Sequence, residues 1–450
     1  MYSVSRKGLR CQICTGCGLC PGVTAENVSS GGQRSEIMPE NGEPGVPGAK
    51  CESADPGGRC TGVTREDGRP GRLQVLTADA LRGERIPFAG NGRRLAVADI
   101  GTTTIAMLLY AADGSVEERF VEVNPQTAYG ADVLSRIKAA EKPSAAVLMQ
   151  EMVRHVLEKG LRKFKRRLSA GEELYLVTAA NTTMTYLLMG WDTAELGHAP
   201  FQASRLSGAE TDLSGIHCFV LPGFSAFVGG DILAGCCACS MTDREEITLL
   251  IDLGTNGELL LGNCHRRIAC ATAAGPAFEG GVNRGIWGAD MIRLLAILRR
   301  DGLLDETGLL AEPYFDRGIR IGNVCVTQEA VRSVQLAKAA IAAGIDVLLK
   351  KYGIPGGAVD RVVLAGGFGY YLDPADAAEI GLLPRIFADR TVSGGNTALS
   401  GAACAGREVI SSGWESAWSR LEGYRKGTEI VNLAMTPGFD ELYIQRMEFK

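Results

Sequence analysis

The sequence predicts an α/β protein built from two similar halves, because one short pattern occurs twice along the chain. The pattern is an apolar strand, an aspartate, a turn rich in glycine and hydroxyl groups, and a second apolar strand. Its copies are residues 95–110, LAVADIGTTTIAMLLY, and residues 247–262, ITLLIDLGTNGELLLG. The two aspartates, Asp99 and Asp252, are separated by about one domain's length. A pattern repeated at that distance predicts a duplicated fold.

Each copy has the chemistry of a phosphate-binding hairpin. A carboxylate at the end of a strand, Asp99 or Asp252, suits a hydrated Mg²⁺ ion. Glycines in the following turn, such as Gly101 and Gly254, let backbone N–H groups approach phosphate oxygens with no Cβ in the way. One such hairpin is a weak signal, since any β-hairpin can carry these residues. Two of them predict a nucleotide held between the halves.

The bulk composition argues against two classes of protein. With a net charge of −5, the chain has no overall basic excess that would attract nucleic acid. No apolar run approaches the length that crosses a membrane, and the first residues, MYSVSRKGLRC, lack the apolar segment of a signal peptide. We therefore expect a cytoplasmic protein that binds neither nucleic acid nor membrane. Its 14 cysteines are expected to serve metal or redox chemistry and not a disulfide framework.

Six cysteines near the amino terminus form a candidate metal site. Four of them are separated by two residues each in CQICTGCGLCP: Cys11, Cys14, Cys17 and Cys20. Close thiolates of this spacing can wrap one iron–sulfur cluster, and they can also bind a structural zinc ion. The bacterial ferredoxin run has three residues before its last cysteine, so the fourth ligand is open between Cys20, Cys51 and Cys60. The pattern predicts a [4Fe–4S] cluster, with zinc or no metal as the alternatives.

Composition divides the chain into four parts. Residues 21–92 are rich in glycine, proline, serine and charge and have few apolar positions, so they cannot bury a core. We expect a cysteine-rich iron–sulfur segment at 1–70 and a linker at 71–92. A first half at 93–245 and a second half at 246–450 follow, and the carboxyl-terminal part of the second is expected to return to the first. A small cluster-bearing segment on a flexible tether suits an electron carrier that must reach a partner.

Between the two hairpins the sequence predicts alternating helices and strands. A polar loop around Asn124 leads into a helix, and Pro143 opens a longer amphipathic helix that extends to Leu168. The basic end of this helix, residues 162–167, is interpreted as a solvated last turn. Residues 177–190, VTAANTTMTYLLMG, predict a strand, a threonine-rich turn and a further helix.

A third carboxylate precedes the second hairpin. Asp231 follows two glycines in FSAFVGGDILAG and is a candidate for positioning or deprotonating the water that attacks a γ-phosphate. The alternative is an aspartate that caps a helix. Cys236, Cys237 and Cys239 follow among alanine and glycine and are interpreted as small packing residues.

The second half continues with two glycine-rich turns and two helices. Residues 273–281, AAGPAFEGG, form a turn that contains Gly275 and Glu279. Residues 327–349 predict a long alanine-rich helix with a threonine N-cap. A short strand at 361–364 leads into AGGFG, where bare backbone would approach an adenine or ribose. The later stretch GNTALSG opens a small-residue helix suited to close packing at a hinge.

The order of these motifs resembles the superfamily of acetate and sugar kinases, heat-shock chaperones and actin. Several stretches are more particular: NPQTAYGADVLSRI, NTTM, GGDILAG, DLGTNGEL, ATAAGPAFEG, QLAKAAIAAGI and AGGFG. Together they resemble the reductive activators of corrinoid-dependent enzymes over residues 93–450. The resemblance implies an actin-like ATPase fold, in which two ribonuclease H-like halves enclose a nucleotide cleft.

The resemblance also implies a role for each motif. Asp99 and Asp252 would bind Mg²⁺ beside the phosphates, and Asp231 would activate the attacking water. The remaining nucleotide contacts would come from the glycine-rich turns: Gly101, Thr102, Thr103, Thr104, Gly254, Thr255, Asn256, Gly257, Gly275, Glu279, Gly366, Gly367, Phe368 and Gly369. ATP, Mg²⁺ and the [4Fe–4S] cluster are the implied cofactors.

The implied activity is ATP-driven transfer of one electron from the cluster to Co(II) of a corrinoid (cobalamin) protein in a methyltransferase system, which regenerates Co(I). An external low-potential donor such as ferredoxin would reload the cluster, and self-association into a homodimer is left open.

The sequence also departs from the better-known relatives. Those carry a plant-type [2Fe–2S] domain in front or a two-cluster ferredoxin domain behind, whereas this sequence shows the compact motif at 11–20. The stretch VNRGIWGAD after AFEGG differs from the family's usual continuation. Two other interpretations stay open: an activator of a radical-type dehydratase, and a non-redox ATP-binding kinase or actin-like scaffold with zinc at the cysteines.

Overall fold

Two six-stranded sheets dominate the computed structural model, and a two-stranded ribbon, β10 (Ile319–Ile321) with β11 (Val324–Val326), stands apart from them.

The candidate cysteine site lies outside the described residues. None of the helices that the structure describes is both long and apolar enough to span a membrane. The described residues are 92–254, 256–274, 288–321 and 324–450.

The first sheet is built on the first predicted hairpin. Strands β1 and β2 pair antiparallel with Asp99 opposite Ala106, and β3 continues the meander. Strand β4 lies parallel to β1, β6 lies parallel to β4, and β5 forms the edge antiparallel to β6. The order is β3-β2-β1-β4-β6-β5, with the bounds β1 Arg93–Ile100, β2 Thr104–Tyr110, β3 Val116–Val123, β4 Glu173–Ala180, β5 Ala209–Asp212 and β6 His217–Val220.

The second sheet repeats this arrangement around the second predicted hairpin. Strands β7 and β8 pair antiparallel with Asp252 opposite Glu258, β9 continues the meander, and β12 and β13 add in parallel beyond β7. The order is β13-β12-β7-β8-β9-β14, with the bounds β7 Thr248–Leu253, β8 Gly257–Gly262, β9 Arg267–Thr272, β12 Arg361–Ala365, β13 Thr391–Gly395 and β14 Thr428–Ile430. Each sheet therefore has a three-stranded meander followed by two parallel strands, which confirms the duplicated α/β fold.

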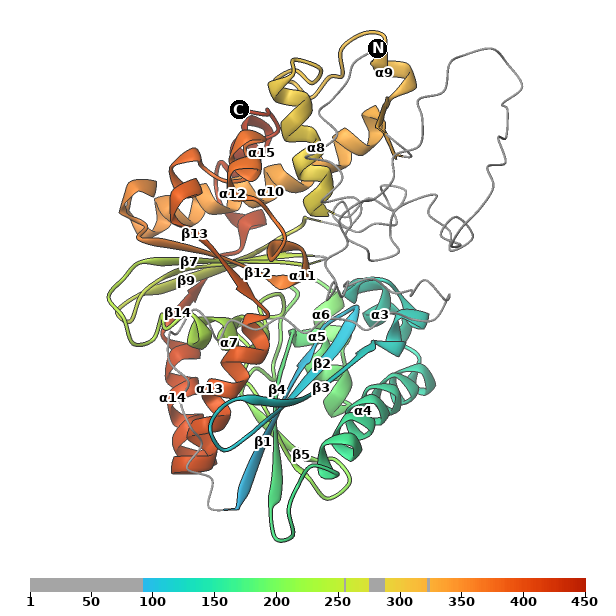
Figure 1. Cartoon of the computed structure of the whole chain (residues 1–450), viewed down its shortest axis with the longest axis vertical. Helices are drawn as coiled ribbons and strands as arrows, with labels where there is room; N and C mark the ends of the chain where they lie inside the picture. The colour runs from blue at the N-terminus through green and yellow to red at the C-terminus, as the bar shows by residue number, and fades with distance from the viewer. Residues whose placement is uncertain (1–91, 255, 275–287, 322–323) are drawn as a thin grey trace, which may run out of the picture.

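Helices cover both faces of each sheet (Figure 1). Side chains alternate along a strand, so Ala96 of β1 packs outward against α4 and α5 whereas Leu95 and Val97 face the space between the sheets. Helices α8, α10 and α12 cover the outer face of the second sheet, and α7, α13 and α14 lie between the two sheets. The bounds are α3 Val133–Ala140, α4 Pro143–Lys165, α5 Thr182–Met189, α6 Ala194–Gly197, α7 Gly230–Ala238, α8 Gly288–Arg300, α9 Tyr314–Arg317, α10 Gln328–Tyr352, α11 Gly366–Gly369, α12 Pro374–Glu379, α13 Thr397–Ser412, α14 Trp414–Lys426 and α15 Phe439–Gln445, with a 3₁₀ turn η2 at Pro125–Tyr129.

The predicted helices form close to their expected limits. The Thr327 hydroxyl caps α10 by accepting a hydrogen bond from the Ala330 amide at 3.2 Å. Helix α4 begins at Pro143 and ends at Lys165, short of the expected Leu168. Helix α7 ends at Ala238, and the three cysteines at its end are buried, as packing residues should be: Cys236, Cys237 and Cys239.

Helices α7 and α13 cross in backbone contact between the two sheets. A Cβ added to Gly401 of α13 would lie 1.8 Å from the carbonyl oxygen of Ala234 on α7. A Cβ added to Gly235 would lie 2.7 Å from Leu250 Cδ2 on β7. Helix α13 also packs on β1 and β4. The chain therefore leaves the second sheet after β13 and lies against the first sheet.

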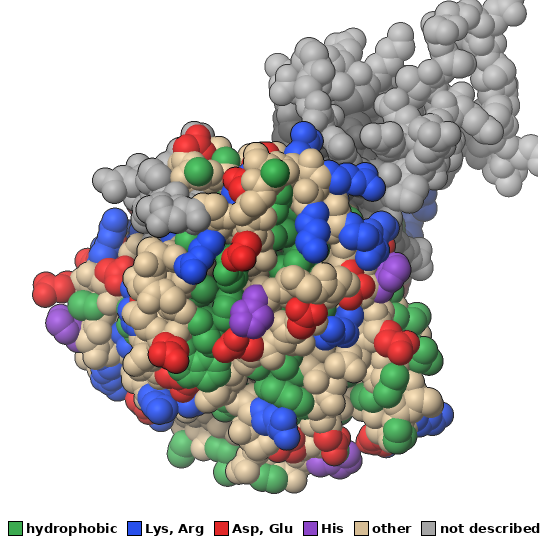
Figure 2. All heavy atoms as spheres, turned by 90° about the horizontal axis from the view of Figure 1, so that it is seen from below, with side chains coloured by type: hydrophobic (Ala, Val, Ile, Leu, Met, Phe, Trp, Pro, Cys, Tyr) green, Lys and Arg blue, Asp and Glu red, His purple; other side chains and the backbone are tan. Residues whose placement is uncertain are grey.

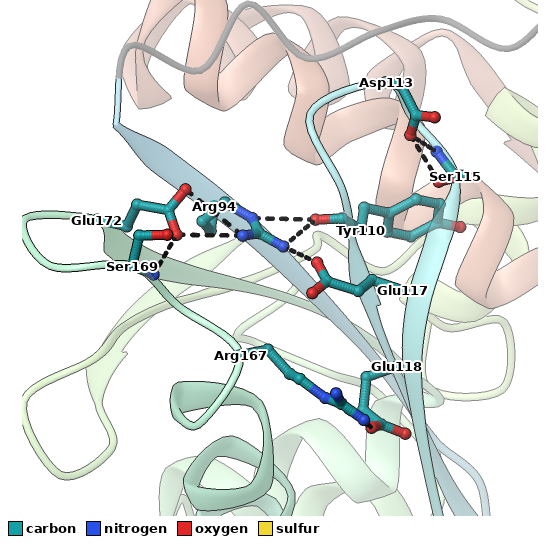
Figure 3. A network of polar contacts seen from close by, with 9 residues as sticks. All are labelled: Arg94, Tyr110, Asp113, Ser115, Glu117, Glu118, Arg167, Ser169 and Glu172. Atoms are coloured by element: carbon teal, nitrogen blue, oxygen red, sulfur yellow. Dashed lines mark hydrogen bonds and ion pairs between the residues drawn. The ribbon is translucent and has the colours of Figure 1, made fainter.

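Ion pairs fasten β1, β3 and the end of α4 to one another (Figure 3). Arg94 on β1 binds Glu117 on β3 and Glu172 in the loop before β4. Glu118, also on β3, binds Lys163 in the last turn of α4 at 2.8 Å and Arg167 just beyond the helix at 2.7 Å. The hydrogen bond from Lys163 is the largest cause that lowers the pKa of Glu118 to about 2. The basic end of α4 is therefore solvated, as expected, and two of its exposed side chains also pair with Glu118.

The charges on the face shown in Figure 2 are mixed in sign. Over most of this face, Lys and Arg side chains alternate with Asp and Glu side chains, and hydrophobic side chains lie between them. Such mixing produces no extended single-sign field of the kind that steers nucleic acid to a protein. This face therefore shows no basic excess, and the net charge of −5 shows none for the whole sequence.

Candidate nucleotide-binding site

The ends of strands from both sheets meet at one place, and the predicted carboxylates lie there. In open α/β sheets, ligands bind beyond the carboxyl-terminal ends of parallel strands. Asp99 is close to the end of β1, Asp252 is close to the end of β7, and Asp231 lies in the first turn of α7. Asp99 also accepts a hydrogen bond from Asn396, which directly follows β13. The loops at the ends of the two sheets are therefore in direct contact.

Burial disfavours the ionised form of four carboxylates at this place, and for three of them the charge of a neighbouring carboxylate adds to the effect. Burial raises the pKa of Asp231 to about 6, of Asp99 to about 7 and of Asp252 to about 8. The charge of Asp231 raises the pKa of both other aspartates further. Burial, followed by the charges of Asp231 and Asp252, also raises the pKa of Glu258 well above its ordinary value. We call these four residues the carboxylate site. Because a nearby positive charge stabilises ionised carboxylates, the arrangement favours cation binding.

The carboxylate site suits a hydrated divalent cation. Within the described ranges, no three His, Cys, Asp or Glu side chains are close enough to hold one metal ion. Mg²⁺ usually keeps several of its waters and takes only one or two carboxylates from the protein. The donor set therefore fits Mg²⁺ bound largely through water, with Asp99 and Asp252 as the strand-end carboxylates.

The first predicted phosphate loop, which is the turn between β1 and β2, directs its carbonyl oxygens into the protein. The Gly101 amide donates to the Thr104 carbonyl at 2.9 Å and closes the turn. The carbonyls of the turn accept hydrogen bonds from the NPQTAYGADVLSRI stretch: Gly101 and Thr103 from Asn124, and Thr102 from Arg136. Asn124 and Arg136 are fully buried. Carbonyl oxygens that faced a phosphate would repel it, so this arrangement is what an anion-binding turn requires.

The second phosphate loop is a tight turn between β7 and β8. The Gly254 amide donates to the Asn256 carbonyl at 2.9 Å, and Asn256 is partly exposed. Gly257 is buried, and a Cβ there would lie 2.6 Å from Thr272 Oγ1. Three predicted contacts lie outside the described residues: Thr255, Gly275 and Glu279.

The loop after β12 lies against the carboxylate site. Gly366, Gly367, Phe368 and Gly369 form the short helix α11. Gly366 has φ +82°, and a Cβ there would lie 2.5 Å from Asp252 Oδ1 and 2.5 Å from the Leu253 carbonyl oxygen. Glycine at this position therefore permits both the left-handed backbone and the close approach to Asp252. Phe368 is half-buried against the core of the second half, and Gly367 is exposed.

Replacing Gly366 by alanine is expected to weaken ATP binding by about 10- to 100-fold. The new Cβ would push Asp252 and Leu253, at the end of β7, away from the loop after β12. Isothermal titration with a non-hydrolysable ATP analogue measures this. The matched control is Gly423→Ala on α14, because nothing lies within 4 Å of a Cβ at that position and no nucleotide contact is assigned to it. Wild-type affinity in the Gly366 variant would show that the close approach is not needed.

Asp231 does not cap its helix. The N-cap of α7 is Gly229, and Asp231 Oδ1 accepts a hydrogen bond from the adjacent Ile232 amide at 2.9 Å. A Cβ on Gly229 would lie 2.5 Å from Asn181 Cα, so the start of α7 rests directly on the end of β4. The capping alternative is therefore wrong. The two glycines bring Asp231 up to the other carboxylates.

Two residues of this place were not assigned a role from the sequence. Asn396 Nδ2 donates to Asp99 Oδ2 at 2.7 Å, and Glu258 lies directly across the β7–β8 pair from Asp252. The sequence around each of these two residues does contain a feature that could have indicated a role. Glu258 is a single charge in the apolar strand GELLLG, and Asn396 is a helix-capping type placed before a small-residue helix.

Comparison with known proteins assigns the chain to a family. The model described as "RACo middle region" matches residues 95–244, and that described as "C-terminal domain of RACo the ASKHA domain" matches residues 246–284 and 282–450. The corrinoid activation enzyme RamQ of Eubacterium limosum is 31% identical over 420 residues, which are 78% of this chain and 69% of that protein. A [Co(II) methylated amine-specific corrinoid protein] reductase of Methanosarcina barkeri is 25% identical over 253 residues, which are 44% of this chain and 46% of that protein.

A solved structure is also similar. The reductive activator for corrinoid,iron-sulfur protein superimposes with a TM-score of 0.67 and 28% sequence identity, and the match covers 80% of this chain and 67% of that chain. These matches agree with the two similar sheets and with the carboxylates at their junction, since all of them indicate a duplicated actin-like fold. The chain therefore belongs to the RACo family and contains its actin-like ASKHA domain.

Proposed function

We infer that this chain is an ATP-dependent reductive activator, which returns a corrinoid protein from inactive Co(II) to Co(I). The observation that carries the inference is the carboxylate site between two phosphate loops, in a chain whose relatives are named for corrinoid activation and Co(II) reduction. A corrinoid protein of a methyltransferase system is the proposed partner, in the cytoplasm. A low-potential protein such as ferredoxin is the proposed electron donor, and association into a homodimer is left to measurement.

The reaction needs ATP because Co(I) is a stronger reductant than common electron donors. For one electron, 59 mV corresponds to about 1.4 kcal/mol, so a gap of roughly 300 mV costs about 7 kcal/mol. Coupling ATP hydrolysis to the conformation of the partner offsets that cost, because closure of the two halves on ATP would change the docking surface or the ligation of the cobalt. Helices α7 and α13 join the halves in backbone contact, so such a change would pass between the halves through them.

We assign the nucleotide contacts as follows. Asp99 and Asp252 hold Mg²⁺ through water, and the turns after β1 and β7 bind phosphates through their amides and through Thr102, Thr103, Thr255 and Asn256. Bound Mg²⁺ neutralises charge on the phosphates. Asp231, whose pKa is about 6, is ionised above that pH and positions or deprotonates the attacking water. The Gly366–Gly369 loop approaches the adenosine.

The electron source is assigned to the cysteine segment. We propose that Cys11, Cys14 and Cys17 hold a [4Fe–4S] cluster, with Cys20, Cys51 or Cys60 as the fourth ligand. A cluster held there supplies the single electron that Co(II) requires. Iron and acid-labile sulfide analysis of the anaerobically purified chain is the decisive measurement. A zinc-containing, iron-free protein would favour a non-redox role instead, and one cluster shared between two subunits would favour a dehydratase activator.

Replacing Cys14 by serine is expected to abolish reduction of the Co(II) partner and to leave ATP binding unchanged. Serine is a poor ligand for iron, and the cysteine segment is far in sequence from the phosphate loops. The growth of the Co(I) absorbance on addition of ATP measures reduction, and titration with an ATP analogue measures binding. Wild-type reduction by the variant would reject the proposed electron path.

A further inference from the structure

Asn396 stands where the chain crosses from one half to the other. Strand β13 ends at Gly395 in the second sheet, and α13 begins at Thr397. Helix α13 then packs on β1 and β4 of the first sheet. Gly395 has φ +62°, a left-handed conformation that favours glycine, so the turn at the crossover is sharp. This crossover is therefore one of the places where the chain joins the two halves, together with the passage from α7 into β7.

Both ends of the Asn396 side-chain amide are used. The carbonyl oxygen Oδ1 accepts a hydrogen bond from the Leu399 amide at 2.8 Å and caps α13. The nitrogen Nδ2 donates to Asp99 Oδ2 at 2.7 Å. One planar group therefore joins the first turn of α13 to the strand-end carboxylate of β1, and rotation of the amide would break both bonds at once.

We propose that Asn396 is a positioning residue, which sets the orientation of the Asp99 carboxylate according to how the two halves are placed. The proposal rests on the proposed function, in which Asp99 acts on Mg²⁺ and ATP. With Oδ2 held by Asn396, Oδ1 is the oxygen left for the hydrated cation. When the halves move and shift the start of α13, the donor moves with it, so the placement of Asp99 follows the closure of the halves.

The competing explanation is that Asn396 only caps a helix. Serine separates the two roles, because serine caps helices about as well as asparagine. The hydroxyl oxygen of the serine would accept the hydrogen bond from the Leu399 amide, and the serine side chain is too short to reach Asp99 as well. Aspartate also keeps the capping oxygen, but it places a carboxylate where the donor to Asp99 had been. Both variants retain the cap and lose the bond to Asp99.

The first arm of the test measures ATP hydrolysis. Asn396→Ser is expected to lower kcat by about 10- to 100-fold and to change the KM for ATP by less than about threefold, because the hydrogen bond that it loses goes to Asp99. Asn396→Asp is expected to lower kcat by at least as large a factor. The matched control is Thr327→Ala, which removes the cap of α10 and should lower the melting temperature with no change in kcat. A folded Asn396→Ser variant whose kcat falls by less than about tenfold overturns the proposal.

The second arm uses the protein without nucleotide, so it does not depend on ATP hydrolysis. Hydrogen–deuterium exchange at residues 99–104 is expected to quicken in Asn396→Ser, whereas exchange in the first turn of α13 should match that of the wild type. Unchanged exchange at 99–104 overturns the proposal even if the enzyme is impaired. If the wild-type protein fails to hydrolyse ATP, the proposed function fails, and this arm still reports on Asn396 itself.

Discussion

Replacing Asp252 by asparagine is expected to abolish ATP hydrolysis and, at the same time, to stabilise the nucleotide-free protein at pH 8. Asparagine has nearly the same shape but no charge. Hydrolysis should fall by about 10²- to 10³-fold, because the variant loses a carboxylate that we propose holds Mg²⁺ at the phosphates. Stability should rise by about 1 kcal/mol, or about 2–4 °C in melting temperature, because a carboxylate that is buried and repelled by Asp231 and Asp99 is removed.

The same carboxylates determine how stability depends on pH. The pKa of Asp252 is raised from 3.8 to about 8 in the folded protein, and those of Asp99 and Asp231 are raised to about 7 and about 6. Between pH 4 and pH 8 the folded state therefore holds protons that the unfolded chain releases, so these groups make stability fall as pH rises. Without Mg²⁺, the wild-type protein should melt at a higher temperature at pH 5.5 than at pH 8.

Calorimetry in EDTA at the two pH values checks this prediction. Asp252→Asn should show a smaller difference in melting temperature between pH 5.5 and pH 8 than the wild type shows. The matched control is Asp301→Asn, because Asp301 is exposed just beyond the end of α8, outside the carboxylate site. Equal differences in the Asp252 variant and the wild type would show that Asp252 does not titrate in this window. Added MgATP should stabilise the wild type and have little effect on the Asp252 variant.

Local chemistry in the sequence was enough to predict both hairpins and the place of their aspartates. Apolar strands interrupted by an aspartate and a glycine turn form where they were expected, at β1–β2 and β7–β8. The reason is that strand propensity and turn chemistry act over a few residues. The same holds for the predicted cap of α10, since Thr327 accepts a hydrogen bond from the amide three residues further on.

Contacts between distant parts of the chain could not be predicted in this way. Asn396 and Asp99 are 297 residues apart in sequence, and only the packing of α13 on the first sheet brings them together. Glu258 reads as an ordinary strand residue until the register places it opposite Asp252. Asp231 was open between a cap and a functional carboxylate, because the choice depends on how closely Gly229 packs on the end of β4. In each case the missing information was tertiary geometry.

Replacing Gly401 by alanine is expected to cost about 3 kcal/mol or more of folding free energy. Alanine normally stabilises a helix interior relative to glycine by about 1 kcal/mol. Here the added Cβ would lie 1.8 Å from the Ala234 carbonyl oxygen and 2.2 Å from the Ala234 carbonyl carbon, and both are backbone atoms that cannot rotate away. Relief requires α7 and α13 to separate along the contact that joins the two halves, which exposes the core between the sheets. Urea unfolding followed by circular dichroism measures the loss.

The matched control for Gly401 is Gly423→Ala in the interior of α14. Nothing lies within 4 Å of a Cβ at Gly423, so this variant should gain about 0.5–1 kcal/mol from helix propensity alone. Opposite signs for the two glycine substitutions would assign the cost at Gly401 to the helix crossing. A Gly401 variant as stable as the wild type would mean that α7 and α13 separate freely, and the two halves could not then be coupled through this contact.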